Sequence, residues 1–181
     1  MSLLDHAITT YRAAAAMLDR VAKTRVDLLA SAAASVRDAS LIEGHRDLGP
    51  DFDICLPAGS RANLAFRRPR TDGIDLETDA PAWMTLEGRL PDTAAAATVC
   101  FAEVGIDCRE PVAADIFLRV IDPDGTYHDQ PPQEMLIAGG LAVTQLDLPQ
   151  DAAAGAYRKV ILHLRRPQMQ LSLRQFALIP L

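Results

Sequence analysis

The chain has 181 residues, of which 49% are hydrophobic and 23% charged, so its composition is that of a folded globular protein and excludes general disorder. The formal net charge of −6 excludes the basic surface that a general nucleic-acid-binding protein needs to displace phosphate counterions. Arginine strongly outnumbers lysine and alanine is abundant, which indicates a GC-rich bacterial genome.

No stretch of the sequence approaches the roughly 20 consecutive apolar residues of a membrane-spanning helix. The N-terminus also lacks a basic region followed by an uninterrupted apolar run, which is the pattern of a secretory signal peptide. We therefore expect no membrane span, and a protein that is cytoplasmic or that is exported without a classical signal peptide.

The first segment, from residue 3 to about residue 40, contains neither Gly nor Pro and follows a potential N-capping serine, Ser2, so we predict a long α-helix. A heptad seam runs along most of it, and its members are Leu4, Tyr11, Leu18, Arg25 and Ala32 at one position and Ile8, Ala15, Ala22, Leu29 and Val36 at the other. An unbroken helix of this length would measure about 54 Å and overhang a body of roughly 37 Å. The seam then predicts a homo-oligomer formed through residues 3–38. The alternative is a helix that breaks near residues 23–25 and folds onto its own domain.

Gly44, Gly49 and Pro50 mark the boundary between a helical, coiled-coil-like segment at residues 1–45 and a second domain at residues 46–181. In the second domain, short runs of alternating apolar and polar residues predict strands near 52–56, 62–67, 82–90, 98–104, 115–121, 134–138, 141–148, 157–165 and 169–178. Clusters of Pro, Gly and Asp separate these runs, and no helical period lies between them. The expected fold is mainly β, an antiparallel jelly-roll-like β-sandwich preceded by a long N-terminal α-helix.

The last two predicted strands follow each other so closely that we expect them to pair with each other. A change of phase in the apolar pattern predicts a β-bulge at Arg174–Gln175, and a similar change predicts a second bulge at Thr144–Gln145.

The strand at residues 82–90 predicts a functional face. Its even-numbered apolar residues, Met84 and Leu86, are expected to point into the core. Trp83, Glu87 and Arg89 then emerge together on the opposite face. There the aromatic ring of Trp83 would stand beside a hydrogen-bond acceptor, Glu87, and a hydrogen-bond donor, Arg89.

The sequence lacks the motifs of nucleophilic hydrolases, zinc proteases, P-loop proteins and dinucleotide-binding proteins, and its four histidines form no H-x-H pair. We therefore expect no catalytic residues and no cofactor, and a non-enzymatic protein is favoured; an enzyme that processes glycans is the remaining alternative. Three cysteines, Cys55, Cys100 and Cys108, are an odd number without metal-ligand spacing, so we expect free thiols. A bridge between Cys100 and Cys108 is the one intramolecular alternative.

Residues 122–129 superficially resemble a calcium loop, but Gly125 stands too early for an EF-hand. The run Asp-Pro-Asp-Gly is instead typical of a β-turn. A structural calcium ion held by Asp122, Asp124 and Asp129 is the alternative for this segment.

The strand rhythm of residues 115–125, 157–165 and 171–180 resembles the closing half of galactose-binding-like jelly-roll carbohydrate-binding modules, whose last strand often has a Leu-x-Leu-x-x-Phe-x-Leu pattern. The resemblance implies a non-catalytic carbohydrate- or ligand-binding module. Sugar platforms need exposed rings, yet aromatic residues make up only 5% of this chain. The candidate ligand-binding residues are Trp83, Glu87, Arg89, Tyr127 and Tyr157. A structural or assembly subunit, whose sandwich binds protein in a surface, phage-like or secretion assembly, is the alternative function.

Overall fold

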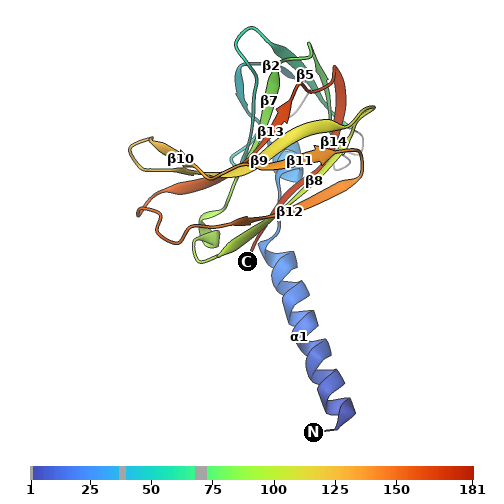
Figure 1. The fold of residues 1–181 in the computed structure, drawn as a ribbon, viewed down its shortest axis with the longest axis vertical. Helices are drawn as coiled ribbons and strands as arrows, with labels where there is room; N and C mark the ends of the chain where they lie inside the picture. Colours follow the sequence, from blue (N-terminus) through green and yellow to red (C-terminus); the bar gives the residue numbers. More distant parts are fainter. Residues whose placement is uncertain (1, 37–39, 68–72) are drawn as a thin grey trace.

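The computed structural model describes residues 2–36, 40–67 and 73–181. It contains two antiparallel seven-stranded sheets and a long N-terminal helix, which confirms the predicted mainly β fold (Figure 1). Within the described ranges, no helix is long and apolar enough to cross a membrane.

The first sheet, called sheet A, has the strand order β12-β8-β14-β6-β5-β2, and β1 pairs with β14 at its side. Its strands are β1 (Val26–Asp27), β2 (Ser40–Glu43), β5 (Arg61–Phe66), β6 (Ile74–Thr78), β8 (Val99–Asp107), β12 (Leu141–Asp147) and β14 (Gln170–Pro180).

The second sheet, called sheet B, has the order β10-β9-β13-β7-β4-β3, and β11 also pairs with β9. Its strands are β3 (His45–Asp47), β4 (Phe52–Cys55), β7 (Trp83–Arg89), β9 (Val112–Ile121), β10 (Tyr127–Asp129), β11 (Gln133–Ile137) and β13 (Tyr157–Arg165). A short 3-10 helix, η2 (Asp92–Ala94), follows β7.

The core lies between the two sheets, because alternate residues of each strand point inward. On β7, Met84 and Leu86 are completely buried, as the sequence pattern predicts. Phe52 of β4 and Phe176 of β14 meet across the core with ring centroids 5.8 Å apart in an edge-to-face arrangement.

The N-terminal helix is not continuous over the predicted length. Helix α1 (Leu3–Thr24) ends at the extended residue Arg25, the two residues of β1 pair with β14, and a second helix, α2 (Leu28–Ser35), follows. Asp27 caps α2 by accepting a hydrogen bond from the Ala30 amide at 3.0 Å. The prediction of one unbroken helix is therefore wrong, and the alternative break near residue 25 is confirmed. Residues 37–39, where the seam prediction ends, lie outside the described residues.

The two helices have different environments. Leu28, Leu29 and Ala32 of α2 are buried in the sandwich core. Helix α1 instead projects away from the sandwich, and none of its described residues is buried (Figure 1). Ser2 caps α1 as predicted, because its hydroxyl accepts a hydrogen bond from the Asp5 amide at 3.1 Å.

The two last strands are not partners. Strand β13 lies between β9 and β7 in sheet B, whereas β14 lies between β8 and β6 in sheet A. Arg166, just after β13, has a φ of +48°, and the connection after it carries the chain from one sheet to the other. The predicted pairing of the two strands with each other is therefore wrong.

The two predicted bulges have different outcomes. The register of β14 on β8 shifts between Leu173 and Gln175, which confirms the first bulge. Strand β12 pairs with β8 without a shift from Leu141 to Asp147, so the second bulge does not exist. The apolar residues that suggested it lie on opposite faces of a regular strand, because Val143 is exposed and Leu146 is buried.

Candidate functional site

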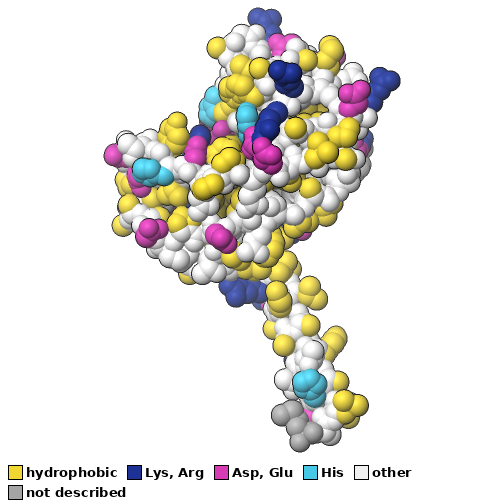
Figure 2. All heavy atoms as spheres, viewed as in Figure 1, with side chains coloured by type: hydrophobic (Ala, Val, Ile, Leu, Met, Phe, Trp, Pro, Cys, Tyr) yellow, Lys and Arg dark blue, Asp and Glu magenta, His cyan; other side chains and the backbone are white. Residues whose placement is uncertain are grey.

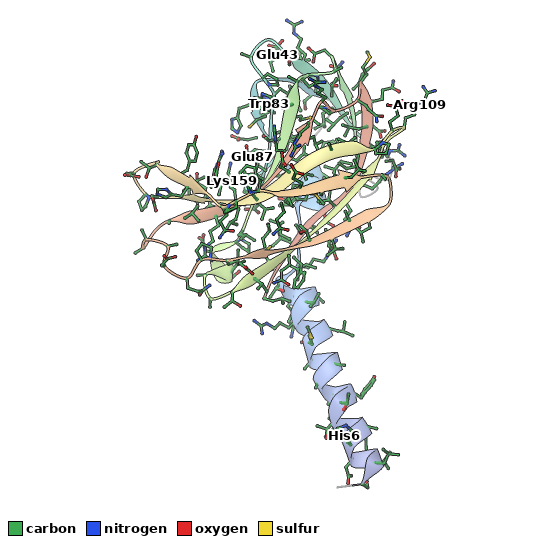
Figure 3. The ribbon with its side chains drawn as sticks, viewed as in Figure 1. His6, Glu43, Trp83, Glu87, Arg109 and Lys159 are labelled. Carbon is green, nitrogen blue, oxygen red and sulfur yellow. The ribbon has the colours of Figure 1, made fainter. Side chains whose placement is uncertain are left out.

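The outer face of sheet B gathers all five residues that the sequence singled out. Trp83, Glu87 and Arg89 alternate along β7, and Arg89 is in register with Lys159 of β13. Ile121 of β9 is in register with Tyr157 on one side and Tyr127 on the other. Residues that are directly opposite in antiparallel strands point to the same face, so the three aromatic rings share one surface. We call this surface the sheet-B face, and Figure 3 shows Trp83, Glu87 and Lys159 on it.

Arginine side chains lie against two of these rings. The Arg89 guanidinium carbon is 4.7 Å from the ring centroid of Tyr157, and that of Arg119 is 4.3 Å from the centroid of Tyr127. Such cation–π contacts hold a ring in place while leaving its other side open to a ligand. Tyr127 remains 58% exposed.

Tyr157 also borders a hollow of about 280 Å³ between η2 and the segment that precedes β13. Its lining includes Pro91, Gln150 and Arg158. The sheet-B face therefore continues into a small concave region beside one of its rings.

Trp83 stands at the other end of the sheet-B face, beside a cluster of ionisable side chains formed by Asp115, His163 and Arg165. Its ring centroid is 6.1 Å from that of His163, whose Nδ1 is 3.4 Å from an Asp115 carboxylate oxygen. Arg165 holds the same carboxylate with two donors and also pairs with Glu134 at 3.0 Å. The hydrogen bonds from Arg165 and the nearby His163 lower the pKa of Asp115, so this carboxylate stays ionised.

A network of charged groups occupies the centre of the sheet-B face. The Lys159 ammonium contacts the Asp53 carboxylate and lies 3.2 Å from Glu87 Oε2. Burial acts to lower the pKa of Lys159, but hydrogen bonds and charge attraction from the two carboxylates outweigh it and raise the pKa. For Asp53 itself, burial raises the pKa against the opposing effect of Lys159. Two carboxylates therefore share one ammonium, which remains charged.

Glu87 is 8% exposed and is already engaged by protein groups. Its Oε1 accepts a hydrogen bond from the Thr85 hydroxyl at 3.1 Å and a weak one from the Cys55 thiol at 3.5 Å. Glu87 thus has a fixed orientation beside Lys159. Basic, acidic and histidine side chains lie close together over the region of β7 and β13 (Figure 2).

The polar members that the sequence interpretation missed are Asp53, Asp115, Arg119, Lys159, His163 and Arg165. A signal for three of them was present. The alternation at residues 157–165 places Lys159, His163 and Arg165 on the same side of the strand as Tyr157.

The candidate calcium residues have protein partners. The predicted turn is confirmed, since the Gly125 amide donates to the Asp122 carbonyl at 2.9 Å. Arg119 donates two hydrogen bonds, of 2.7 and 2.8 Å, to the two carboxylate oxygens of Asp129. Asp122 lies 3.3 Å from His128, and Asp124 accepts hydrogen bonds from Thr126.

Among the described residues, one group of three potential metal ligands comes together within 4.8 Å, and it consists of His45, Asp47 and Asp53 at the edge of the sheet-B face. The Lys159 ammonium already neutralises Asp53 and would oppose a cation there. The three cysteines are free, and Cys100 is buried, which agrees with the predicted thiols.

A larger hollow, of about 910 Å³, lies on the outer face of sheet A. Asn63, Glu77 and Gln170 stand in one row across three strands of its floor, and Asp75 and Ser172 stand in the next row. Arg67 donates to Asp75 and to Ser172. None of the described residues that line this hollow is aromatic.

No protein-family model matches the sequence, and no curated protein matches it. Several solved structures have a similar fold. A xylan-binding module of carbohydrate-binding family 15 is 9% identical, with 78% of this chain and 96% of that chain covered and a TM-score of 0.46. A xylan-binding domain of family 22 is 14% identical, with 83% and 91% covered and a TM-score of 0.45. A family 11 carbohydrate-binding module from Clostridium thermocellum is 8% identical, with 78% and 87% covered and a TM-score of 0.40. The chain thus weakly resembles carbohydrate-binding modules, and TM-scores below 0.5 are too low to transfer a function.

Proposed function

We propose that the chain is a non-catalytic carbohydrate-binding module whose ligand lies on the sheet-B face. The observation that carries the proposal is that Trp83, Tyr157 and Tyr127 stand on one surface together with hydrogen-bonding charged groups. A sugar has an apolar C–H face that stacks on an aromatic ring and a rim of hydroxyls that bonds to carboxylates and guanidinium groups. The sheet-B face offers both in one place.

The spacing of the rings favours an oligosaccharide over a single sugar. Strands β10 and β7 are separated by β9 and β13, so three interstrand spacings, or about 14 Å, lie between Tyr127 and the strand that carries Trp83. A ligand that contacts both ends has to cross these strands. Arg165 and Arg119 lie along this path, each paired with a carboxylate, and their remaining N–H groups are available to donate to hydroxyl groups.

The outer face of sheet A is the less suitable surface for a glycan. Its hollow is larger, but the absence of a ring among its described lining residues leaves nothing on which a sugar can stack. Variants on that face therefore serve as controls.

The test is a glycan array on the full chain, followed by calorimetric titration with the soluble oligosaccharide that binds best. We expect Trp83→Ala and Tyr127→Ala each to weaken binding at least tenfold. The matched control is Phe101→Ala, which removes a half-buried ring from the outer face of sheet A and should leave the affinity within a factor of two. Glu77→Ala in the hollow should behave in the same way. Binding that is lost in Glu77→Ala but kept in Trp83→Ala would place the ligand on sheet A and overturn the proposal.

We further propose that α1 joins copies of the chain into an oligomer. Leu3, Leu4, Tyr11 and Leu18 are 87%, 67%, 76% and 69% exposed, which is costly for an isolated helix in water. Light scattering should give at least twice the protomer mass of 19.6 kDa. The variant Leu4→Glu/Leu18→Glu should be a monomer with an unchanged sandwich, and a monomeric wild-type chain would contradict the proposal.

The same exposed helix also fits the alternative function, a structural or assembly subunit whose sandwich binds protein. The two functions differ in the glycan experiment. A chain that oligomerises but binds no sugar in the array would favour the assembly role.

A further inference from the structure

The seam of α1 gives more than the ability to associate, because its flanks differ in charge. Within α1 the seam consists of Leu4, Ile8, Tyr11, Ala15, Leu18 and Ala22. None of these described residues is buried by the sandwich, and hydrophobic side chains run along the helix in Figure 2. The seam is therefore complete and open over the full helix.

One flank of the seam is charged, and the other is not. Asp5, Arg12 and Asp19 follow the seam residues Leu4, Tyr11 and Leu18, and all three are exposed. The opposite flank carries Ala7, Ala14 and Val21. In a helix pair, these flanks decide which charges meet.

A parallel pair places the charged flank of one helix against the uncharged flank of the other. Asp5, Arg12 and Asp19 then meet alanine or valine side chains and keep their charged ends in water. The parallel arrangement in register also brings each seam residue to its own counterpart, so Leu4 meets Leu4 and Leu18 meets Leu18.

An antiparallel pair brings the two charged flanks together. In the register that overlaps the helices completely, Leu4 meets Ala22 and Ile8 meets Leu18. Arg12 then lies near Arg12 of the other helix, and Asp5 near Asp19, so every close charge pair is repulsive.

A shift of one heptad removes the repulsion but loses part of the seam. When the shift moves the overlap toward the two N-termini, Leu18 and Ala22 have no partner. When it moves the overlap toward the two C-termini, the first turn of each helix runs past Arg25 of the other helix, where Arg25 is bound to Glu103 of the sandwich. The sandwich therefore blocks the second antiparallel register.

We infer that α1 associates with a second copy of this chain in parallel and in register, which rests on the self-association proposed above. The end of α1 is fixed to its sandwich, because Arg25 pairs with Glu103 and the two residues after it pair with β14. Parallel helices therefore place the sandwiches at one end of the bundle. The sheet-B faces are then presented together, so that one polymeric ligand can engage more than one of them.

The test uses two single-cysteine variants in the full chain, Leu4→Cys and Ala22→Cys. Each is oxidised alone and in an equal mixture, with the wild-type chain and its three native cysteines as the control, and the links are identified by mass mapping. We expect a 4–4 link in the first variant, a 22–22 link in the second and at least tenfold less 4–22 link in the mixture. Ala22→Cys changes the helix little, so it keeps the test valid if Leu4→Cys fails to assemble.

Light scattering before oxidation separates two kinds of failure. An oligomeric chain that forms a 4–22 link, or that forms none of the three links, would overturn the parallel arrangement and leave self-association standing. A monomeric wild-type chain would overturn self-association itself and this inference with it.

Discussion

Arg25 donates a hydrogen bond from its Nε to Glu103 Oε2 at 3.1 Å, and its Nη2 lies at the same distance from that oxygen. The two residues are far apart in the sequence, and Arg25 occupies a seam position of the heptad pattern. The seam therefore ends where this arginine turns to the sandwich. Gln175 donates to the same carboxylate at 2.6 Å, so the end of α1 is held by β8 and β14 together.

We predict that Arg25→Leu lowers stability even though it makes the heptad pattern more apolar. The variant leaves Glu103 without its cation and frees the end of α1, and we expect a loss of about 1 kcal/mol because the pair is partly exposed. Thermal denaturation of the full chain measures this. Arg12→Leu, on the exposed flank of α1, is the matched control and should change the melting temperature little. A higher melting temperature for Arg25→Leu would show that the helix runs straight through residue 25.

Gly88 makes room for helix α2 in the core. A Cβ atom at this position would lie 2.4 Å from Leu28 Cδ1 and 3.0 Å from Leu178 Cδ1, and both leucines are completely buried. We predict that Gly88→Ala destabilises the fold by about 1–3 kcal/mol through overpacking. A double-mutant cycle with Leu28→Ala checks the cause, since the smaller side chain should absorb the added methyl. Strictly additive losses would mean that the two residues do not collide.

The pair of Arg165 and Asp115 predicts a pH dependence of stability. Arg165 lowers the pKa of Asp115 in the folded state, so the pair stabilises the fold above the unfolded pKa of about 4, and this contribution is lost as the pH falls through the lower, folded value. We predict that Arg165→Gln is less stable than the wild type at pH 7 and that the difference shrinks below pH 4. Urea denaturation across this range measures it. His163 also lies against Asp115, and Glu134 also pairs with Arg165. The control is Arg109→Gln, which removes an exposed arginine elsewhere. Its stability difference from the wild type should not shrink below pH 4.

The three thiols should differ in reactivity. Burial, with the Glu87 charge, raises the pKa of Cys55 to about 11, and burial raises the pKa of Cys100 to about 12. We predict that iodoacetamide at pH 8 modifies partly exposed Cys108 first and Cys100 last, because the thiolate is the reactive form. In denaturant without reductant, all three should react. A missing modification on Cys100 and Cys108 together would reveal a disulfide between them.

The sequence was sufficient for the strands that alternate regularly and for the orientation of their side chains. Trp83, Glu87 and Arg89 lie on one face because the period of two needs no knowledge of the partner strand. The sequence was insufficient for the choice of partner. Strands β13 and β14 have similar apolar patterns, and which sheet each joins depends on contacts with β9 and β8 that are remote in the chain.

Short polar strands were missed for a related reason. Strand β3 consists of His45, Arg46 and Asp47 and has no apolar residue whose alternation would indicate a strand. Asp53 was missed because it belongs to an expected strand but gains its role from Lys159, 106 residues away. The heptad seam caused the opposite error, the prediction of a helix that is too long. Its period continues through the break at Arg25 into α2, where Leu29 faces the core.

Sheet B ends in short strands at both edges, and this has a consequence for solubility. Strand β3, with three exposed charged or ionisable residues, forms one edge. The other edge is divided between β10 and β11, and Pro131 and Pro132 lie between them. Proline cannot donate a ladder hydrogen bond, and short charged edges give an incoming strand little to pair with. In the oligomer proposed above, these edges would therefore oppose the edge-to-edge aggregation that the crowding of copies promotes.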